Sequence, residues 1–205
     1  DRYMASVSSL GVVNDQKGLD YFPDPKSEEN LVKVLQPLPR QYVIVVVGAA
    51  HRTKVPTVDK YREILNAIGN KPFVLIGGEK DRMFAEGIVK NLEVETFNLC
   101  GKTTLDVSAV LIKNAVFVIS PDTGMMHVAA AYKKPIVSLW GSTVPEFGMT
   151  PYYGKFDVPS LIVEEKNLSC RPCSKIGYGN CPKKHFNCVV LLDTKKITKW
   201  VDENF

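Results

Sequence analysis

The sequence lacks the features of a membrane-spanning or exported chain. No apolar run approaches the roughly 18 residues that a transmembrane helix needs, and no positively charged start leads into an apolar core, as a signal peptide would. We therefore expect a soluble, cytoplasmic protein. The sequence begins at Asp1 rather than at Met, so we also expect that processing or truncation has removed an upstream part.

Strong charge of one sign is also missing. The 205 residues carry 26 Lys and Arg against 22 Asp and Glu, a formal net charge of +4, and these charges are scattered along the chain. A nucleic-acid-binding protein usually concentrates Lys and Arg on one stripe, so no nucleic-acid partner is expected. The length suffices for one substantial domain with a smaller extension.

The first 40 residues have the composition of a connector. Residues 1–11 are predicted to form a short helix that ends at Gly11. Residues 12–40 are rich in Pro, Asp, Lys and Asn and end in a Pro-Leu-Pro-Arg run at 37–40. Because Pro removes a backbone donor and blocks regular structure, we expect a linker that leads into a main domain over residues 41–205.

From Tyr42 onwards, apolar runs alternate with helix-like periodicity. Continuous β-branched runs predict strands that are buried on both faces, as in a parallel sheet. The predicted strands cover residues 42–47, 73–76, 96–99, 116–119 and 136–139, and the predicted helices cover 58–69, 80–91, 104–114 and 124–132. This order predicts an α/β domain with a Rossmann-like parallel sheet. After residue 150 we expect irregular structure, a Cys-rich loop and a final amphipathic helix over 194–204.

Ligands of such sheets bind beyond the carboxyl ends of the strands, so the loops after the strands are candidate sites. After the first strand, Thr53 offers a hydroxyl, and Arg52 and Lys54 offer positive charge suited to a diphosphate; a polar loop with solvated cations is the alternative. After the second strand, Glu79 or Asp81 could accept hydrogen bonds from ribose hydroxyls, or could simply favour the dipole of the next helix.

The segment Ser120–His127 follows the fourth strand. Asp122 or Thr123 could cap the next helix, and Gly124 leaves its first amides open, an arrangement that binds anions. His127 could hold a phosphate or a sugar hydroxyl, or could be a core histidine. Together with the Trp140–Pro145 loop as a fourth wall, these loops predict a ligand that carries phosphate.

The order of these motifs resembles glycosyltransferase family 9, the heptosyltransferases of lipopolysaccharide synthesis. The resemblance covers roughly residues 42–192, and its most specific part is the Asp-Thr-Gly-x-x-His segment in its context. The matching stretches are Gly48–Lys54, Leu75–Glu79, Leu99–Leu105, Ser120–Ala131, Lys134–Val137, Leu139–Thr143 and the Cys-rich loop.

The resemblance implies one half of a two-domain GT-B enzyme. Residues 41–205 would be the C-terminal, nucleotide-sugar-binding domain, and residues 1–40 the end of an N-terminal domain plus linker. The family is inverting and needs no metal for catalysis. Its members move a heptose or related sugar from an ADP-sugar to a lipopolysaccharide core acceptor, which implies a place at the inner face of the inner membrane with peripheral membrane contact. The acceptor site and the general base would lie in the N-terminal domain, so no catalytic residue is expected in this chain.

The resemblance also implies roles for single residues. Thr53 and Lys54 would hold donor phosphates, and Glu79, or Asp81 as second choice, would bind the nucleoside. The remaining donor contacts would come from Asp122, Thr123, Gly124 and His127. Two alternatives stay open: a sugar-nucleotide hydrolase or epimerase with an acid/base pair drawn from Glu79, Asp122 and His127, and a non-catalytic nucleotide-sugar-binding module.

Four cysteines near the end of the chain are spaced Cys-x2-Cys-x7-Cys-x6-Cys: Cys170, Cys173, Cys181 and Cys188. A structural zinc site would use such a Cys-x2-Cys pair as its first half. Two disulfides are a second possibility, which a cytoplasmic location disfavours. The third is four reduced thiols that pack an irregular loop. Cys100 follows a buried strand and is expected in the core.

Overall fold

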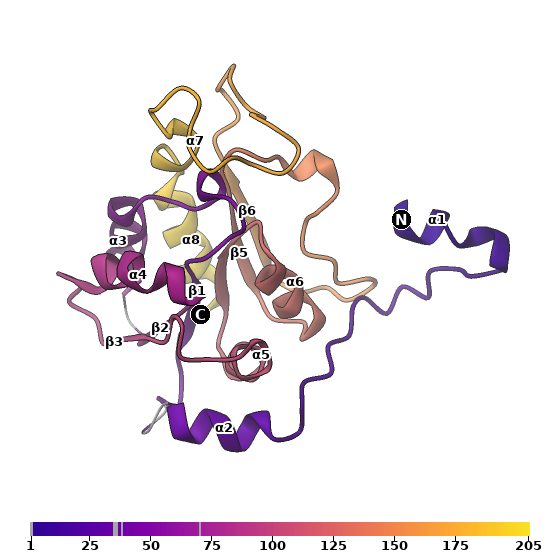
Figure 1. The fold of residues 1–205 in the computed structure, drawn as a ribbon, viewed down its shortest axis with the longest axis horizontal. Coiled ribbons are helices and arrows are strands. Elements are labelled where there is room, and N and C mark those ends of the chain that lie inside the picture. Colours follow the sequence, from indigo (N-terminus) through magenta and orange to yellow (C-terminus); the bar gives the residue numbers. More distant parts are fainter. Residues whose placement is uncertain (1, 35–36, 38, 70) are drawn as a thin grey trace.

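The computed structural model of the protein describes residues 2–34, 37, 39–69 and 71–205. A six-stranded sheet in the order β3-β2-β1-β4-β5-β6 forms its centre (Figure 1). The strands are β1 Val43–Val46, β2 Phe73–Ile76, β3 Thr96–Asn98, β4 Val118–Pro121, β5 Ile136–Trp140 and β6 Ser160–Glu164. Every neighbouring pair is parallel, which confirms the predicted α/β, Rossmann-like fold.

Helices cover both faces of the sheet, because successive side chains of a strand point to opposite faces. Val43 and Val45 of β1 pack with α3 (Val58–Ala67), α4 (Arg82–Val89) and α8 (Thr194–Asn204). Ile44 and Val46 pack with α5 (Leu105–Asn114) and α6 (Gly124–Ala131) on the other face (Figure 1). Burial on both faces explains why these strands are continuous apolar runs.

Side-chain caps fix the starts of three helices. The hydroxyls of Thr57 and Thr104 accept hydrogen bonds from the amides of Lys60 and Val107, at the starts of α3 and α5. Asp193 caps α8 in the same way. Each cap satisfies an amide that has no partner within its helix, and α8 matches the predicted helix over 194–204.

The strand order reverses between β1 and β4, which are neighbours although β2 and β3 intervene in the sequence. Such a reversal opens a crevice at the carboxyl edge of the sheet, where α/β proteins bind ligands. The loop after β1 and the start of α6 after β4 lie at this point. The fold therefore brings together the loops that the sequence marked as candidates.

The predicted linker is only partly irregular. Helix α2 (Ser27–Val34) lies within residues 12–40, and its Leu31 is buried in the core on the α5 side. Upstream of it, the hydroxyl of Tyr21 donates to Asp106 of α5. The expectation of a linker without regular structure is wrong for residues 27–34, because the apolar face of α2 has a partner in α5. Residues 35, 36 and 38 of the predicted linker lie outside the described part of the chain.

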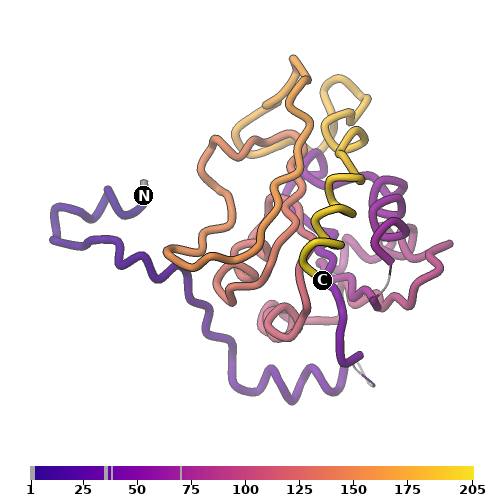
Figure 2. Tube along the Cα trace, turned by 180° about the vertical axis from the view of Figure 1, so that it is seen from behind, coloured from indigo at the N-terminus to yellow at the C-terminus, as the bar shows by residue number. Residues whose placement is uncertain are grey.

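The N-terminal arm before Gly18 projects from the body of the molecule (Figure 2) and is held at its base, where the Gln16 carbonyl accepts from the Lys155 amide. It contains α1 (Arg2–Ala5) and a 3-10 turn, η1 (Ser8–Leu10), which stops at Gly11 with φ of 75°. The predicted helix that ends at Gly11 is thus confirmed as two short turns, with Asp1 outside the described residues. Among the described residues, no helix is long and apolar enough to cross a membrane.

Two elements after residue 150 depart from the expected irregular structure. Strand β6 extends the sheet beside β5, and a short helix, α7 (Asn187–Val190), contacts β5. Only Val163 of β6 is fully buried. An edge strand with one buried side chain carries little hydrophobic pattern, which explains why the sequence did not reveal it.

Candidate functional site

Lys54 and Asp122 form an ion pair at the crevice between β1 and β4. The Lys54 Nζ lies 2.7 Å from the Asp122 Oδ2, and the two side chains are 15% and 9% exposed. The same ammonium also donates to the Asp122 carbonyl at 3.3 Å. The pair therefore joins the loop after β1 to the start of α6.

Asp122 does not cap α6. Its Oδ2 also accepts a hydrogen bond from the Thr143 hydroxyl at 2.9 Å, so the carboxylate is turned towards Lys54 and the loop after β5. Thr123 is the N-cap residue, without a capping bond from its side chain, and Gly124 is exposed. The first amides of α6 are thus left without a side-chain acceptor, and a helix N-terminus of this kind favours an anion.

Two cavities meet the start of α6. The first, of about 330 Å³, is lined by Thr123 and Met125 and by the loops after β1, β2 and β3. The second, of about 610 Å³, is lined by Lys54, Asp122 and an apolar wall that includes Trp140 and Phe147. The N-terminal end of α6 therefore borders both cavities.

Thr53 is not free to bind a ligand, contrary to the role given to it from the sequence. The residue is 1% exposed. Its hydroxyl donates to the Tyr178 carbonyl at 2.9 Å and accepts from the Tyr178 amide and the Ser142 hydroxyl. One donor and two acceptor positions are all that a hydroxyl has, so Thr53 holds the loop rather than the ligand.

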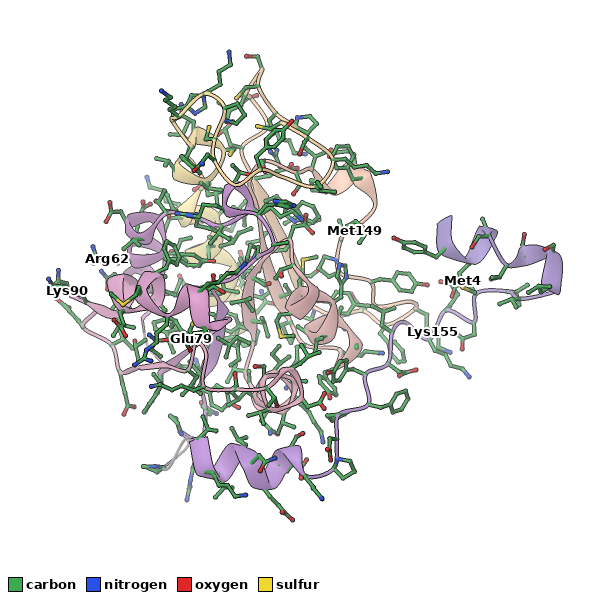
Figure 3. All side chains as sticks on the ribbon, in the orientation of Figure 1. Met4, Arg62, Glu79, Lys90, Met149 and Lys155 are labelled. Atoms are coloured by element: carbon green, nitrogen blue, oxygen red, sulfur yellow. The ribbon has the colours of Figure 1, made fainter. Side chains whose placement is uncertain are left out.

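Of the two acidic candidates after β2, Asp81 lines the first cavity and Glu79 does not. Glu79 is exposed and lies 3.7 Å from Arg82; Figure 3 shows it beside the first turn of α4. The Asp81 carboxylate instead accepts from the Gly78 amide at 2.9 Å and packs so closely on Gly48 that a β-carbon there would lie 2.3 Å from it. The structure thus favours the second choice.

His127 lies on the first turns of α6, half-buried. Burial lowers the pKa of its imidazole below the usual value near 6.5, Asp122 opposes this shift, and Lys54 adds to it. His127 is therefore neutral at pH 7 and close enough to the Lys54–Asp122 pair to respond to its charges. The structure places it with the other candidates at the start of α6.

The four late cysteines are free thiols, which contradicts the two disulfides considered as the second possibility. Within the described residues, no group of three or more His, Cys, Asp or Glu side chains is arranged to hold a metal ion. The structural zinc site considered as the first possibility, at Cys170, Cys173, Cys181 and Cys188, is thus not found in the described part of the chain. Cys181 and Cys188 are buried, while the Cys173 thiol donates to the Cys170 carbonyl. Reduced thiols that pack an irregular loop describe this segment.

Two groups of residues at the site were not among the residues predicted from the sequence. Thr103 and Thr104 line the first cavity from the loop after β3, and Ser108 lines it from α5. The Thr103 and Ser108 hydroxyls lie 2.8 Å apart. The loop after β3 could have been predicted as a candidate, since it also follows a strand at the carboxyl edge of the sheet. Arg171 and Tyr178 bind the loops that carry the site residues. No local sequence pattern predicts this, because their partners lie far away in the sequence.

The model of glycosyltransferase family 9 (heptosyltransferase) matches residues 3–177 of the chain. The chain belongs to this family. Over 107 residues it is 40% identical to lipooligosaccharide heptosyltransferase 2 of Haemophilus influenzae, a match that covers 50% of this chain and 30% of the relative. Over 78 residues it is 38% identical to lipopolysaccharide heptosyltransferase 2 of Escherichia coli, covering 36% of this chain and 22% of the relative.

Solved structures of the family share the fold. A family 9 glycosyltransferase from Veillonella parvula superposes with a TM-score of 0.74 at 18% identity, over 98% of this chain and 58% of the other. The E. coli ADP-heptose lipopolysaccharide heptosyltransferase II gives 0.68 at 19% identity, over 90% and 52%. The family 9 chain thus spans about half the length of these solved relatives, and its fold is that of one half of them.

Proposed function

We propose that this chain is the donor-binding half of a heptosyltransferase, which moves heptose or a related sugar from an ADP-sugar to a lipopolysaccharide core acceptor. The observation that carries the proposal is the start of α6, where Thr123 lines one cavity and Asp122 the other. A nucleoside diphosphate sugar has the matching three-part form, with an anionic centre between a nucleoside and a sugar.

The first cavity suits the nucleoside. Leu105 and Met125 offer apolar surface for a base, and Asp81 offers a carboxylate for ribose hydroxyls. Gly48 and Gly77 also line this cavity, and their lack of side chains leaves the room that the Asp81 side chain occupies. The name of the E. coli relative refers to ADP-heptose, which supports adenine as the base.

The diphosphate would lie at the start of α6, beside Lys54. In an inverting displacement, the acceptor oxygen attacks the anomeric carbon while the bond from that carbon to the diphosphate oxygen breaks. Negative charge then builds up on the leaving diphosphate. The α6 amides and the Lys54 ammonium stabilise this charge without a metal ion, as the family resemblance implies for the reaction. Thr53 contributes by fixing the backbone that carries Lys54.

The donor sugar would occupy the second cavity. The Asp122 carboxylate suits sugar hydroxyls better than phosphate because it is an anion, and His127 lies nearby to contact the sugar or the β-phosphate. Asp122 already binds Lys54 and Thr143, so we assign it to positioning. The base that deprotonates the acceptor would come from the N-terminal domain, of which residues 1–40 would be the end and the linker.

This function implies that the protein acts in the cytoplasm, at the inner face of the inner membrane. There it would reach the lipopolysaccharide acceptor through peripheral contact with the membrane. The full-length protein would be needed for both acceptor binding and turnover.

Calorimetry with ADP-heptose and a transfer assay with the same chain test the proposal together. We expect saturable donor binding and negligible transfer, because the base is missing. Efficient transfer by this chain alone would overturn the division of roles. Release of free sugar or an epimerised product without acceptor would support the hydrolase or epimerase alternative, and absence of donor binding would reject the proposal altogether.

A further inference from the structure

The segment from Cys170 to Tyr178 passes directly behind the loop that follows β5. Three consecutive carbonyls of this loop accept hydrogen bonds from the segment. The Gly141 carbonyl accepts from Arg171 Nε at 2.6 Å, and the Thr143 carbonyl from Arg171 Nη2 at 2.8 Å. Between them, the Ser142 carbonyl accepts from the Cys173 amide at 3.0 Å. Arg171 and Cys173 thus fix the backbone of residues 141–143.

Arg171 is held rigidly and its charge is compensated inside the protein. Its Nη1 lies 2.7 Å from the Glu164 Oε2, at the end of β6, and both side chains are almost fully buried, at 4% and 7% exposure. The same nitrogen donates to the Glu165 carbonyl at 3.1 Å. A planar guanidinium with four such bonds sets a geometry that a lysine cannot reproduce. Arg171 therefore acts through position rather than through free positive charge.

The loop that Arg171 fixes carries the contacts of the donor site. The Thr143 hydroxyl donates to Asp122. The Ser142 amide donates to the Thr53 carbonyl at 3.1 Å, and the Ser142 hydroxyl donates to the Thr53 hydroxyl at 2.8 Å. A shift of Thr143 would thus displace a partner of Asp122, whereas the backbone next to Lys54 is also held by the bonds between Thr53 and Tyr178.

We propose that Arg171 is a positioning residue for the sugar end of the donor, which it does not touch. Through Thr143 it fixes the Asp122 carboxylate in the second cavity. The first cavity is lined by loops that Arg171 does not contact. The inference rests on the proposed function, and it predicts that loss of Arg171 geometry weakens binding of the sugar selectively over binding of the nucleotide.

Arg171→Lys tests this by calorimetry with ADP-heptose and with ADP. The lysine keeps the charge opposite Glu164 but cannot donate to the Gly141 and Thr143 carbonyls as a fork. We expect about a tenfold loss of ADP-heptose affinity, the size of one lost buried hydrogen bond, and less than about a threefold change for ADP. Arg62→Lys is the control, since Arg62 of α3 is 27% exposed and donates to the Gly87 carbonyl of α4, away from the site.

A second pair of variants changes Thr143, the residue through which Arg171 is proposed to act on Asp122. Thr143→Val should reproduce the selective loss of ADP-heptose affinity, and Thr143→Ser should restore it, because only the hydroxyl is needed. If Arg171→Lys fails to fold, the double variant Arg171→Met with Glu164→Gln leaves no unpaired buried charge and should show the same selective loss.

Unchanged affinity for both ligands in the Arg171 and Thr143 variants would overturn the inference. Equal losses for ADP and ADP-heptose would also overturn it, because they would indicate a general structural role. Absence of ADP-heptose binding by the unaltered chain would instead reject the proposed function.

Discussion

The Lys54 ammonium and the Asp122 carboxylate lie 2.7 Å apart, although 68 residues separate them in the sequence. The contact joins the loops after β1 and β4 where the strand order reverses. It also pairs the cation proposed to bind the diphosphate with the carboxylate proposed to bind the sugar. Each of these groups therefore controls the charge that the other presents to a ligand.

Lys54→Met removes the cation and leaves Asp122 as an uncompensated anion beside the start of α6. We expect ADP affinity to fall by about 10- to 100-fold, because a charge-assisted bond is lost and repulsion is gained. Calorimetry with ADP measures the change. Lys54→Arg retains the charge and should lose less than the Met variant. A Met variant with unaltered ADP affinity would exclude Lys54 from the phosphate site.

Asp122→Asn removes the anion but keeps an oxygen that can accept the Thr143 hydrogen bond. We expect ADP to bind at least as tightly as before, since Lys54 is freed and the repulsion is gone. The affinity for ADP-heptose should no longer exceed the affinity for ADP, because the amide is a weaker acceptor for sugar hydroxyls. The ratio of the two affinities is the decisive quantity. A fall in ADP affinity alone would contradict the assignment of Asp122 to the sugar.

Thr53→Val leaves the buried Tyr178 amide and Ser142 hydroxyl without their partner. We expect the free energy of unfolding to fall by about 1–3 kcal/mol, measured by urea denaturation. Thr53→Ser keeps the hydroxyl and serves as the control, with a smaller loss. If Thr53→Val were fully stable but unable to bind ADP, the hydroxyl would have to contact the ligand directly.

The position of Thr53 shows where sequence-based prediction ends. Its Arg-Thr-Lys context has the chemistry of an exposed phosphate loop. Its burial is decided by Tyr178, 125 residues later in the chain, and no local pattern contains that contact. The strands behind the site were predictable, because burial on both faces produces continuous apolar runs. The shared edge of the loops then followed from the parallel arrangement.

The choice between Glu79 and Asp81 was open for a similar reason. Both carboxylates follow β2 within one turn, and the sequence cannot say which of them points inwards. The 3-10 turn η3 (Glu79–Asp81) directs Asp81 back to the Gly78 amide and leaves Glu79 exposed.

His127 should make stability depend on pH. Its folded-state pKa lies below the unfolded value near 6.5 because of burial, so the unfolded chain binds the proton more readily. Its contribution to stability is therefore complete above about pH 6.5 and is lost as the pH falls from there towards the folded-state pKa. Urea denaturation between about pH 5 and pH 7.5 measures the slope. His127→Gln should flatten this part of the profile, and an unchanged slope would contradict the assignment.

Leu105 tests the first cavity without a large cost in stability, because it is 59% exposed and lines that cavity. Leu105→Ala should lower ADP affinity by about 3- to 10-fold through lost apolar contact with the base. Binding of inorganic pyrophosphate, which has no base, should not change. Met83→Ala is the matched control, since Met83 is also exposed but lies on α4 outside the cavity lining. Equal effects of the two variants would place the base elsewhere.

The central claim is that the start of α6 binds the diphosphate between a nucleoside cavity and a sugar cavity. Titration calorimetry of this chain with AMP, ADP and ADP-heptose tests it most directly. The account predicts that ADP binds at least about tenfold more tightly than AMP, since the second phosphate reaches Lys54 and the α6 amides, and that ADP-heptose binds more tightly than ADP. Equal affinity for AMP and ADP, or no binding of any of the three, would contradict it.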